Sequence, residues 1–95
     1  MDGNRILVNN GLIINWGQKY CGIIPPNSVS TYDVDFPISF TQKYKAIGSV
    51  LAYGSWGQAH IVGFNYDILT KLAWGCWNHY SANGELTVTY IAIGY

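Results

Sequence analysis

The sequence predicts an all-β fold, an antiparallel six-stranded β-sandwich, on three observations. Stretches of alternating apolar and polar residues recur at intervals of roughly 10 to 15 residues. Turn-forming dipeptides such as Pro25–Pro26 and Asn83–Gly84 separate them. No segment has the 3.6-residue period of an amphipathic helix. A chain of 95 residues with this pattern is expected to form one domain around one core.

The first five strands are expected between recognisable turns. In the first of them Leu12, Ile14 and Trp16 share one face, which we expect to be buried, while Ile13 and Asn15 share the other. The polar, turn-rich residues 1–10 are expected to be a linker. The five expected strands are residues 11–18, 31–36, 47–53, 58–64 and 68–77.

The sixth strand, residues 86–95, is expected to be the element around which the rest of the domain is arranged. It follows Asn83–Gly84, which predicts entry through a tight hairpin. Leu86, Val88 and Tyr90 are expected to face the core. Ile91 and Ile93 continue the opposite, threonine-bearing face, so the end of the strand is apolar on both sides. One small domain covers only one of these faces, and we therefore expect it to oligomerise through this sheet.

Composition and charge exclude several classes of function. Charged residues make up 11% of the chain and aromatic residues 16%, and the formal net charge is zero. The five basic residues are scattered, so nucleic acid is not an expected partner. No apolar run approaches the roughly 20 residues that span a bilayer, and Met1–Asn4 does not open a signal peptide, so membrane insertion is not expected. The chain is expected to be soluble and made in the cytoplasm.

Cys21 and Cys76 are the two cysteines of the chain. They form no CxxC motif and have no histidine at metal-ligand spacing. The favoured interpretation is two small buried apolar residues. The alternative is a disulfide between them, if the protein works outside the cell.

Three segments together resemble a known family. They are Gly-Leu-Ile-Ile-Asn-Trp-Gly at 11–17, Asp-Phe-Pro-Ile-Ser-Phe at 35–40 and Tyr-Ile-Ala-Ile-Gly-Tyr at 90–95. In this order they resemble the C-terminal tip domain of bacteriophage tail-fibre proteins, over about residues 10 to 95.

The resemblance implies an H-type-lectin-like sandwich that assembles as a homotrimer at the distal end of a virion tail fibre. It implies relatives in prophages and phage-tail-like particles, synthesis in the host cytoplasm, and partners among the other tail-fibre components. Residues 11–95 would be the tip domain, and residues 1–10 a linker or a connection to the fibre shaft. The aromatic loops of this chain depart from the family pattern, so the resemblance does not specify a ligand.

Two loops carry the aromatic and amide side chains that suit recognition of a bacterial surface glycan or another outer-membrane receptor. Aromatic faces stack on sugar rings, while Asn, Gln and His supply directional hydrogen bonds. The alternative is that several of these residues belong to the core or to an interface. The candidate ligand-binding residues are Tyr53, Trp56, Gln58, Trp77, Asn78, His79, Tyr80 and Asn83.

His60, Ile91 and Ile93 are the candidate residues of the trimer interface. A metal site of three His60 side chains on a threefold axis is a second interpretation, and a hydrogen-bonded interface histidine is favoured over it. No metal or cofactor is therefore expected.

Asp33 and Asp35 lie two positions apart on a strand, about 7 Å from each other. This spacing is compatible with the two carboxylates of a glycosidase or with a metal site. A solvated strand face is the favoured interpretation. No motif of a catalytic nucleophile occurs. We therefore expect a binding module, with a structural trimerisation cap as the alternative and a polysaccharide-degrading enzyme as the weakest hypothesis.

Overall fold

The computed structural model describes residues 3–7, 10–53 and 59–95. Within these ranges every regular element is a strand, and no helix is present that could cross a membrane. The strands are β1 (Gly3–Leu7), β2 (Ile13–Ile24), β3 (Ser28–Asp35), β4 (Tyr44–Tyr53), β5 (Ala59–Asn65), β6 (Lys71–Asn78) and β7 (Gly84–Gly94).

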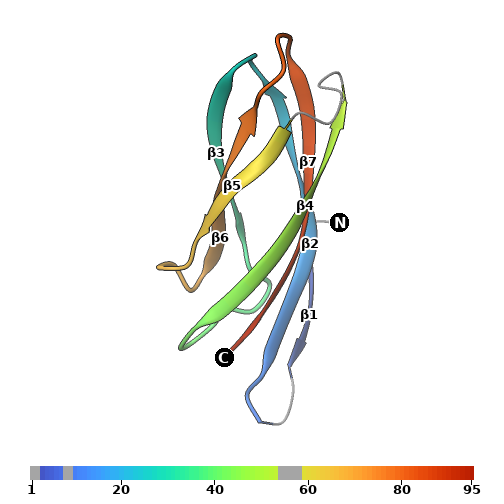
Figure 1. Ribbon diagram of the computed structural model, residues 1–95. Coiled ribbons are helices and arrows are strands. Elements are labelled where there is room, and N and C mark those ends of the chain that lie inside the picture. Colours follow the sequence, from blue (N-terminus) through green and yellow to red (C-terminus); the bar gives the residue numbers. More distant parts are fainter. Residues whose placement is uncertain (1–2, 8–9, 54–58) are drawn as a thin grey trace.

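The strands form two antiparallel sheets, which confirms the predicted sandwich. The four-stranded sheet has the order β1-β2-β7-β4, and the three-stranded sheet has the order β3-β6-β5. Figure 1 shows the two sheets face to face, with β7 between β2 and β4. The described residues contain seven strands rather than the expected six, because residues 3–7 of the expected linker pair with β2.

The alternation along β7 is confirmed. Leu86, Val88 and Tyr90 are buried between the sheets, with at most 2% of each exposed. Ile91 and Ile93 lie on the outer face and are 40% and 43% exposed. One side of β7 therefore belongs to the core of this chain, and the other side is left open.

The predicted orientation of the first strand is wrong. Ile13 and Asn15 face the core, and Asn15 is fully buried. Its amide nitrogen donates to the Ile38 carbonyl at 2.9 Å, and its oxygen accepts from the Ile38 N–H at 3.1 Å, so burial leaves neither atom unsatisfied. Ile14 and Trp16 instead lie opposite Ile93 and Ile91 of β7.

The link between β6 and β7 is not the expected hairpin. β6 belongs to the three-stranded sheet and β7 to the four-stranded one, so residues 79–83 cross from one sheet to the other. β2 also continues to Ile24, beyond residue 18, where the first strand was expected to end. It contains a bulge between Tyr20 and Gly22.

The end of β7 packs closely against the start of β4. A Cβ atom on Gly94 would overlap the Lys43 carbonyl oxygen and the Tyr44 side chain. The carbonyl oxygen of Tyr95 accepts hydrogen bonds from the backbone N–H groups of residues 41, 42 and 43, at 2.9, 2.6 and 3.2 Å. The overlap leaves no room for a side chain at position 94, and the hydrogen bonds fix the end of β7 against the start of β4.

Candidate functional site

Three rings stack at one end of the three-stranded sheet, and we call Trp77, His79 and His60 the aromatic stack. The Trp77 and His79 rings lie 5.1 Å apart at an interplanar angle of 15°. The His79 and His60 rings lie 4.7 Å apart at 12°, and His79 Nε2 is 3.1 Å from His60 Nδ1. All three side chains are exposed to solvent. The stack is therefore an aromatic surface available from outside the sandwich.

Asn78 positions the loop that carries His79. Its amide nitrogen donates to the carbonyls of Ile24 at 3.0 Å, Ala82 at 2.9 Å and Pro25 at 3.4 Å. Its oxygen accepts from the Tyr80 N–H at 3.0 Å. Asn78 is fully buried and its side chain holds the loop in place, while its role as a binding residue stays a prediction.

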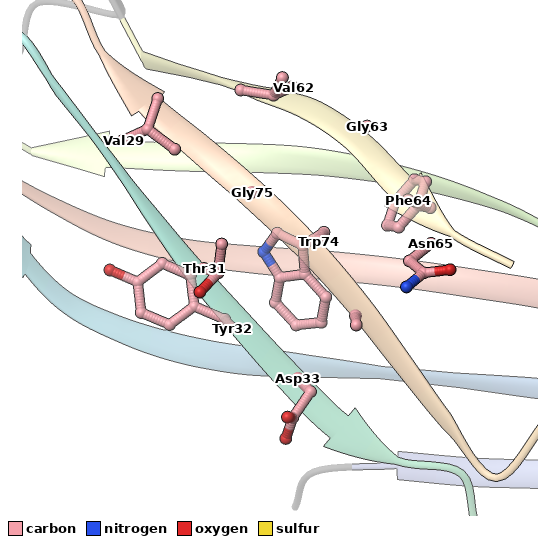
Figure 2. A pocket seen from close by; sticks show the side chains of 11 residues that line it. Val29, Thr31, Tyr32, Asp33, Val62, Gly63, Phe64, Asn65, Trp74 and Gly75 are labelled. Carbon is pink, nitrogen blue, oxygen red and sulfur yellow. The ribbon is translucent and has the colours of Figure 1, made fainter. Parts of the chain in front are cut away.

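A groove of about 570 Å³ runs along the outer face of the three-stranded sheet. The outward-facing residues in the middle of the central strand β6 are small, Ala73 and Gly75. The strand therefore forms a low floor between β3 and β5. Figure 2 shows Thr31 and Asp33 along one side of this floor and Asn65 along the other. We call this feature the β6 groove.

The β6 groove leads toward the aromatic stack. Val29, at one end of its lining, is the cross-strand neighbour of Trp77. His60 pairs with Trp77 on the other side. The two features thus form one continuous surface along the outer face of this sheet.

The floor of the groove contains two directly paired glycines, Gly63 on β5 and Gly75 on β6. A Cβ atom on Gly63 would meet nothing within 4 Å, and one on Gly75 would meet only ordinary contacts at 3.8 to 3.9 Å. Neither glycine has a positive φ angle. Packing and backbone conformation within the chain therefore do not require them, although glycine weakens a strand interior. Close approach of an external group is a recurrent reason for such glycines.

The polar groups of the β6 groove are few and spaced along its edges. The Asp33 carboxylate lies 3.9 Å from Lys71 Nζ, and both side chains remain partly exposed. Asp33 and Asp35 are both exposed, as favoured from the sequence. No group of three metal-ligating side chains occurs in the part of the chain that the structure describes. An apolar floor with a few hydrogen-bonding groups is typical of small-molecule and sugar sites.

The structure brings together some of the predicted binding residues and separates others. Trp77 and His79 are in contact, with His60 beside them. Tyr80 is half-buried, and Asn83 is exposed in the same loop. The side chain of Tyr53 and residues Trp56 and Gln58, which were also predicted, lie outside the described residues. Sequence reasoning singled out Asp33 but missed the other groove residues, although small residues at alternating positions 73 and 75 were a usable signal.

His60 does not share a face with the other predicted interface residues. It lies on the outer face of the three-stranded sheet, in the aromatic stack. Ile91 and Ile93 lie on the outer face of the four-stranded sheet. The three residues therefore lie on opposite faces of the sandwich, and their place in a trimer interface stays a prediction.

The outer face of the four-stranded sheet carries a contiguous apolar surface, which we call the isoleucine face. Across the strands, Ile6 pairs with Ile14 and Ile14 with Ile93, while Trp16 and Ile47 both pair with Ile91. Ile47 is 74% exposed and Ile6 is 50% exposed. Contiguous exposed apolar surface of this kind commonly marks an interface. The isoleucine face consists of Ile6, Ile14, Trp16, Ile47, Ile91 and Ile93.

The fold is that of known tail-fibre structures. The R1 pyocin fibre of P. aeruginosa, comprising C-terminal residues 323–701, matches all of this chain with a TM-score of 0.76 at 18% identity, and this chain spans 28% of it. An N-truncated R1-type pyocin tail fibre matches with a TM-score of 0.77 at 18% identity, and the chain spans 87% of it. The R2 pyocin fibre of P. aeruginosa gives 0.58 at 21% identity over 26% of its length. At these identities the similarity shows the fold.

The sequence also defines the family. Residues 6–95 match the family described as "Putative tail fiber protein gp53-like, C-terminal", and the chain belongs to it. This confirms the resemblance predicted from segments 11–17, 35–40 and 90–95. A comparison with curated proteins finds no match.

Proposed function

We propose that this domain is the receptor-binding tip of a phage or phage-tail-like fibre, and that it attaches the particle to a bacterial cell through a surface glycan. Family membership makes the chain the C-terminal domain of a tail-fibre protein. The observation that carries the proposal is the exposed aromatic stack at the end of the β6 groove.

The chemistry of this surface suits a sugar. The apolar face of a pyranose ring stacks on a flat aromatic side chain such as Trp77. The Thr31 hydroxyl, the Asp33 carboxylate and the Asn65 amide offer donors and acceptors to hydroxyl groups along the groove. The groove is shallow, and modest affinity at each site suffices when several identical sites act together on one particle.

We propose that a homotrimer provides these repeated sites and that the isoleucine face is closed by neighbouring copies of the chain. Ile91 retains 40% exposure, so covering it would contribute about 1 kcal/mol per chain. An Asp in its place would put an unpaired charge into the contact, at a cost of several kcal/mol. Light scattering is expected to give the mass of three chains for the unmodified domain and of one chain for Ile91→Asp or Ile93→Asp.

Val29→Asp is the matched control for the trimer, because Val29 is an exposed apolar residue on the other sheet. It should leave the three-chain mass unchanged. A one-chain mass for the unmodified domain at micromolar concentration would contradict the trimer. So would Ile91→Asp and Ile93→Asp variants that assemble and melt like the unmodified domain, since the isoleucine face would then not be the contact.

The recognition surface is tested by competition for adsorption of the particle to its host cells. The unmodified domain is expected to block adsorption. Trp77→Ala removes the stacking ring, and Gly75→Val narrows the groove from a position where the added Cβ atom meets only ordinary contacts. Both variants are expected to fold, to assemble, and to lose most of the blocking activity.

Thr89→Val, an exposed position on the opposite sheet, is the control and should block adsorption as well as the unmodified domain. If Trp77→Ala and Gly75→Val also block normally, the assignment of this surface is wrong. If the unmodified domain does not block adsorption, the domain is a structural trimerisation cap. We infer that the domain is not an enzyme, and release of reducing ends from host polysaccharide would contradict that inference.

A further inference from the structure

The bulge in β2 directs one side chain into the sandwich. Tyr20 pairs with Thr87 and Gly22 pairs with Leu86, so Cys21 is the extra residue without a cross-strand partner. Gly22 has a φ angle of 77°, in the left-handed region that favours glycine. Bulges of this kind re-aim a side chain. The Cys21 side chain accordingly packs against the buried core cluster.

Cys76 meets Cys21 from the opposite sheet. It lies on the inward face of β6 and is fully buried. Both thiols are free, and they lie near enough for each to shift the pKa of the other. The Cys21 thiol donates to the Lys19 carbonyl at 3.6 Å. Cys21 is only half-buried, whereas Cys76 is fully buried, so Cys21 is the cysteine that a small disulfide would meet first. These are the two cysteines of the chain.

We propose that Cys21 and Cys76 are a site of oxidative modification, at which a small disulfide such as oxidised glutathione converts the thiol pair into a disulfide that joins the two sheets. The inference rests on the bulge, on the burial of Cys76 and on the packing of Cys21 against the core cluster that contains Cys76. It does not depend on the proposed receptor or on the oligomeric state.

The reaction proceeds by two thiol–disulfide exchanges. The Cys21 sulfur, as thiolate, attacks one sulfur of the small disulfide, whose S–S bond breaks and releases one small thiolate. The Cys76 thiolate then attacks Cys21 Sγ, and the mixed disulfide breaks and releases the second small thiolate. Two electrons pass from the cysteines to the small disulfide, and the two cysteine protons end on the two released thiols.

The thiol pair is prepared for the second exchange. The neighbouring Cys21 thiol lowers the pKa of Cys76, and the neighbouring Cys76 thiol together with burial raises the pKa of Cys21. One proton therefore leaves the pair more readily than two. The raised pKa of Cys21 makes its thiolate rare, so the first exchange is the slow step, and the lowered pKa of Cys76 favours the second exchange.

The disulfide would connect the sheet that carries the aromatic stack to the sheet that carries the isoleucine face. Cys76 directly precedes Trp77 of the aromatic stack, and β2 carries part of the isoleucine face. The bond would close a loop between positions 21 and 76, which restricts the unfolded chain and stabilises the folded one. An increase in melting temperature of at least about 10 °C is expected.

The experiment compares the complete chain after incubation with reduced or oxidised glutathione. The oxidised sample is expected to lose both titratable thiols, to lose the mass of two hydrogen atoms, to yield a linked Cys21–Cys76 peptide, and to melt at higher temperature. Cys21→Ser should abolish the increase in melting temperature, and a Cys21→Ala variant provides the same test without a new hydroxyl group.

Three results would overturn the proposal. The chain could keep both thiols after oxidation, it could carry glutathione on Cys21 without the internal bond, or it could link Cys21 to a second chain. An unchanged melting temperature in a sample with the internal bond would overturn the stabilising role.

Discussion

Replacement of Asn78 by alanine should destabilise the domain far more than its position at the end of a strand suggests. The substitution leaves the Ile24 carbonyl without its buried partner, at a cost of about 1 to 3 kcal/mol. The Ala82 carbonyl and the Tyr80 N–H lose partners at partly buried positions, where water replaces some of the loss. The expected total is about 3 kcal/mol, a large fraction of the 5 to 15 kcal/mol or so that stabilises an ordinary domain.

Urea unfolding at neutral pH measures this effect. Asn78→Ala should lower the midpoint with an unchanged slope, and the melting temperature should fall by roughly 15 °C. Hydrogen exchange at the Tyr80 amide should accelerate, because that amide donates to the Asn78 side chain. The matched control is Asn83→Ala, an exposed asparagine in the same connection, which should change the stability by less than about 0.5 kcal/mol.

The comparison of the two asparagines decides the interpretation. Equal stabilities for the two variants would refute the structural role assigned to Asn78. A stable Asn78→Ala variant that nevertheless failed to block adsorption would support the binding role predicted for Asn78 from the sequence.

Two further predictions concern Gly94, where β7 packs against β4, and the hydroxyl group of Tyr44. Gly94→Ala should destabilise the domain by about 1 to 3 kcal/mol in urea unfolding, because its Cβ atom would overlap the backbone at the start of β4; an unchanged midpoint would show that this backbone yields freely. Burial raises the pKa of the Tyr44 hydroxyl above its usual 10.0, so the folded state keeps a proton that the unfolded chain releases. The stability that this hydroxyl contributes is present below pH 10 and falls as the pH rises through the folded-state pKa. Tyr44→Phe lacks the hydroxyl, so it should lose less stability than the unmodified chain between about pH 9 and pH 11. Parallel losses in both proteins would contradict this.

Alternation predicted which residues share a face more reliably than which face is buried. On β7 both were predicted correctly, because threonines at 87 and 89 mark the outer side. On β2 the apolar set Leu12, Ile14 and Trp16 looked like the core face, and Asn15 looked like a surface residue. The outer face is itself apolar there, and the polar atoms of Asn15 are satisfied by Ile38, more than 20 positions away. Sequence alone does not reveal such a partner.

The candidate site was predictable only in part, for a similar reason. Trp77 and His79 were found from the aromatic and amide content of one segment. Asn78 was grouped with them, although alternation along a strand puts it on the opposite face from Trp77. The contact of His60 with His79 and the pairing of Gly63 with Gly75 depend on how β5 aligns with β6. That alignment is a long-range property that periodicity does not specify.

The central place of β7 has a consequence for the order in which the domain is built during synthesis. β7 follows the other six strands in the sequence, yet β2 and β4 pair with it and not with each other. Until β7 has left the ribosome, β2 and β4 each have an edge of unpaired backbone groups, and such edges promote pairing with other chains. The four-stranded sheet is therefore expected to close late and through long-range contacts, which favours slow folding.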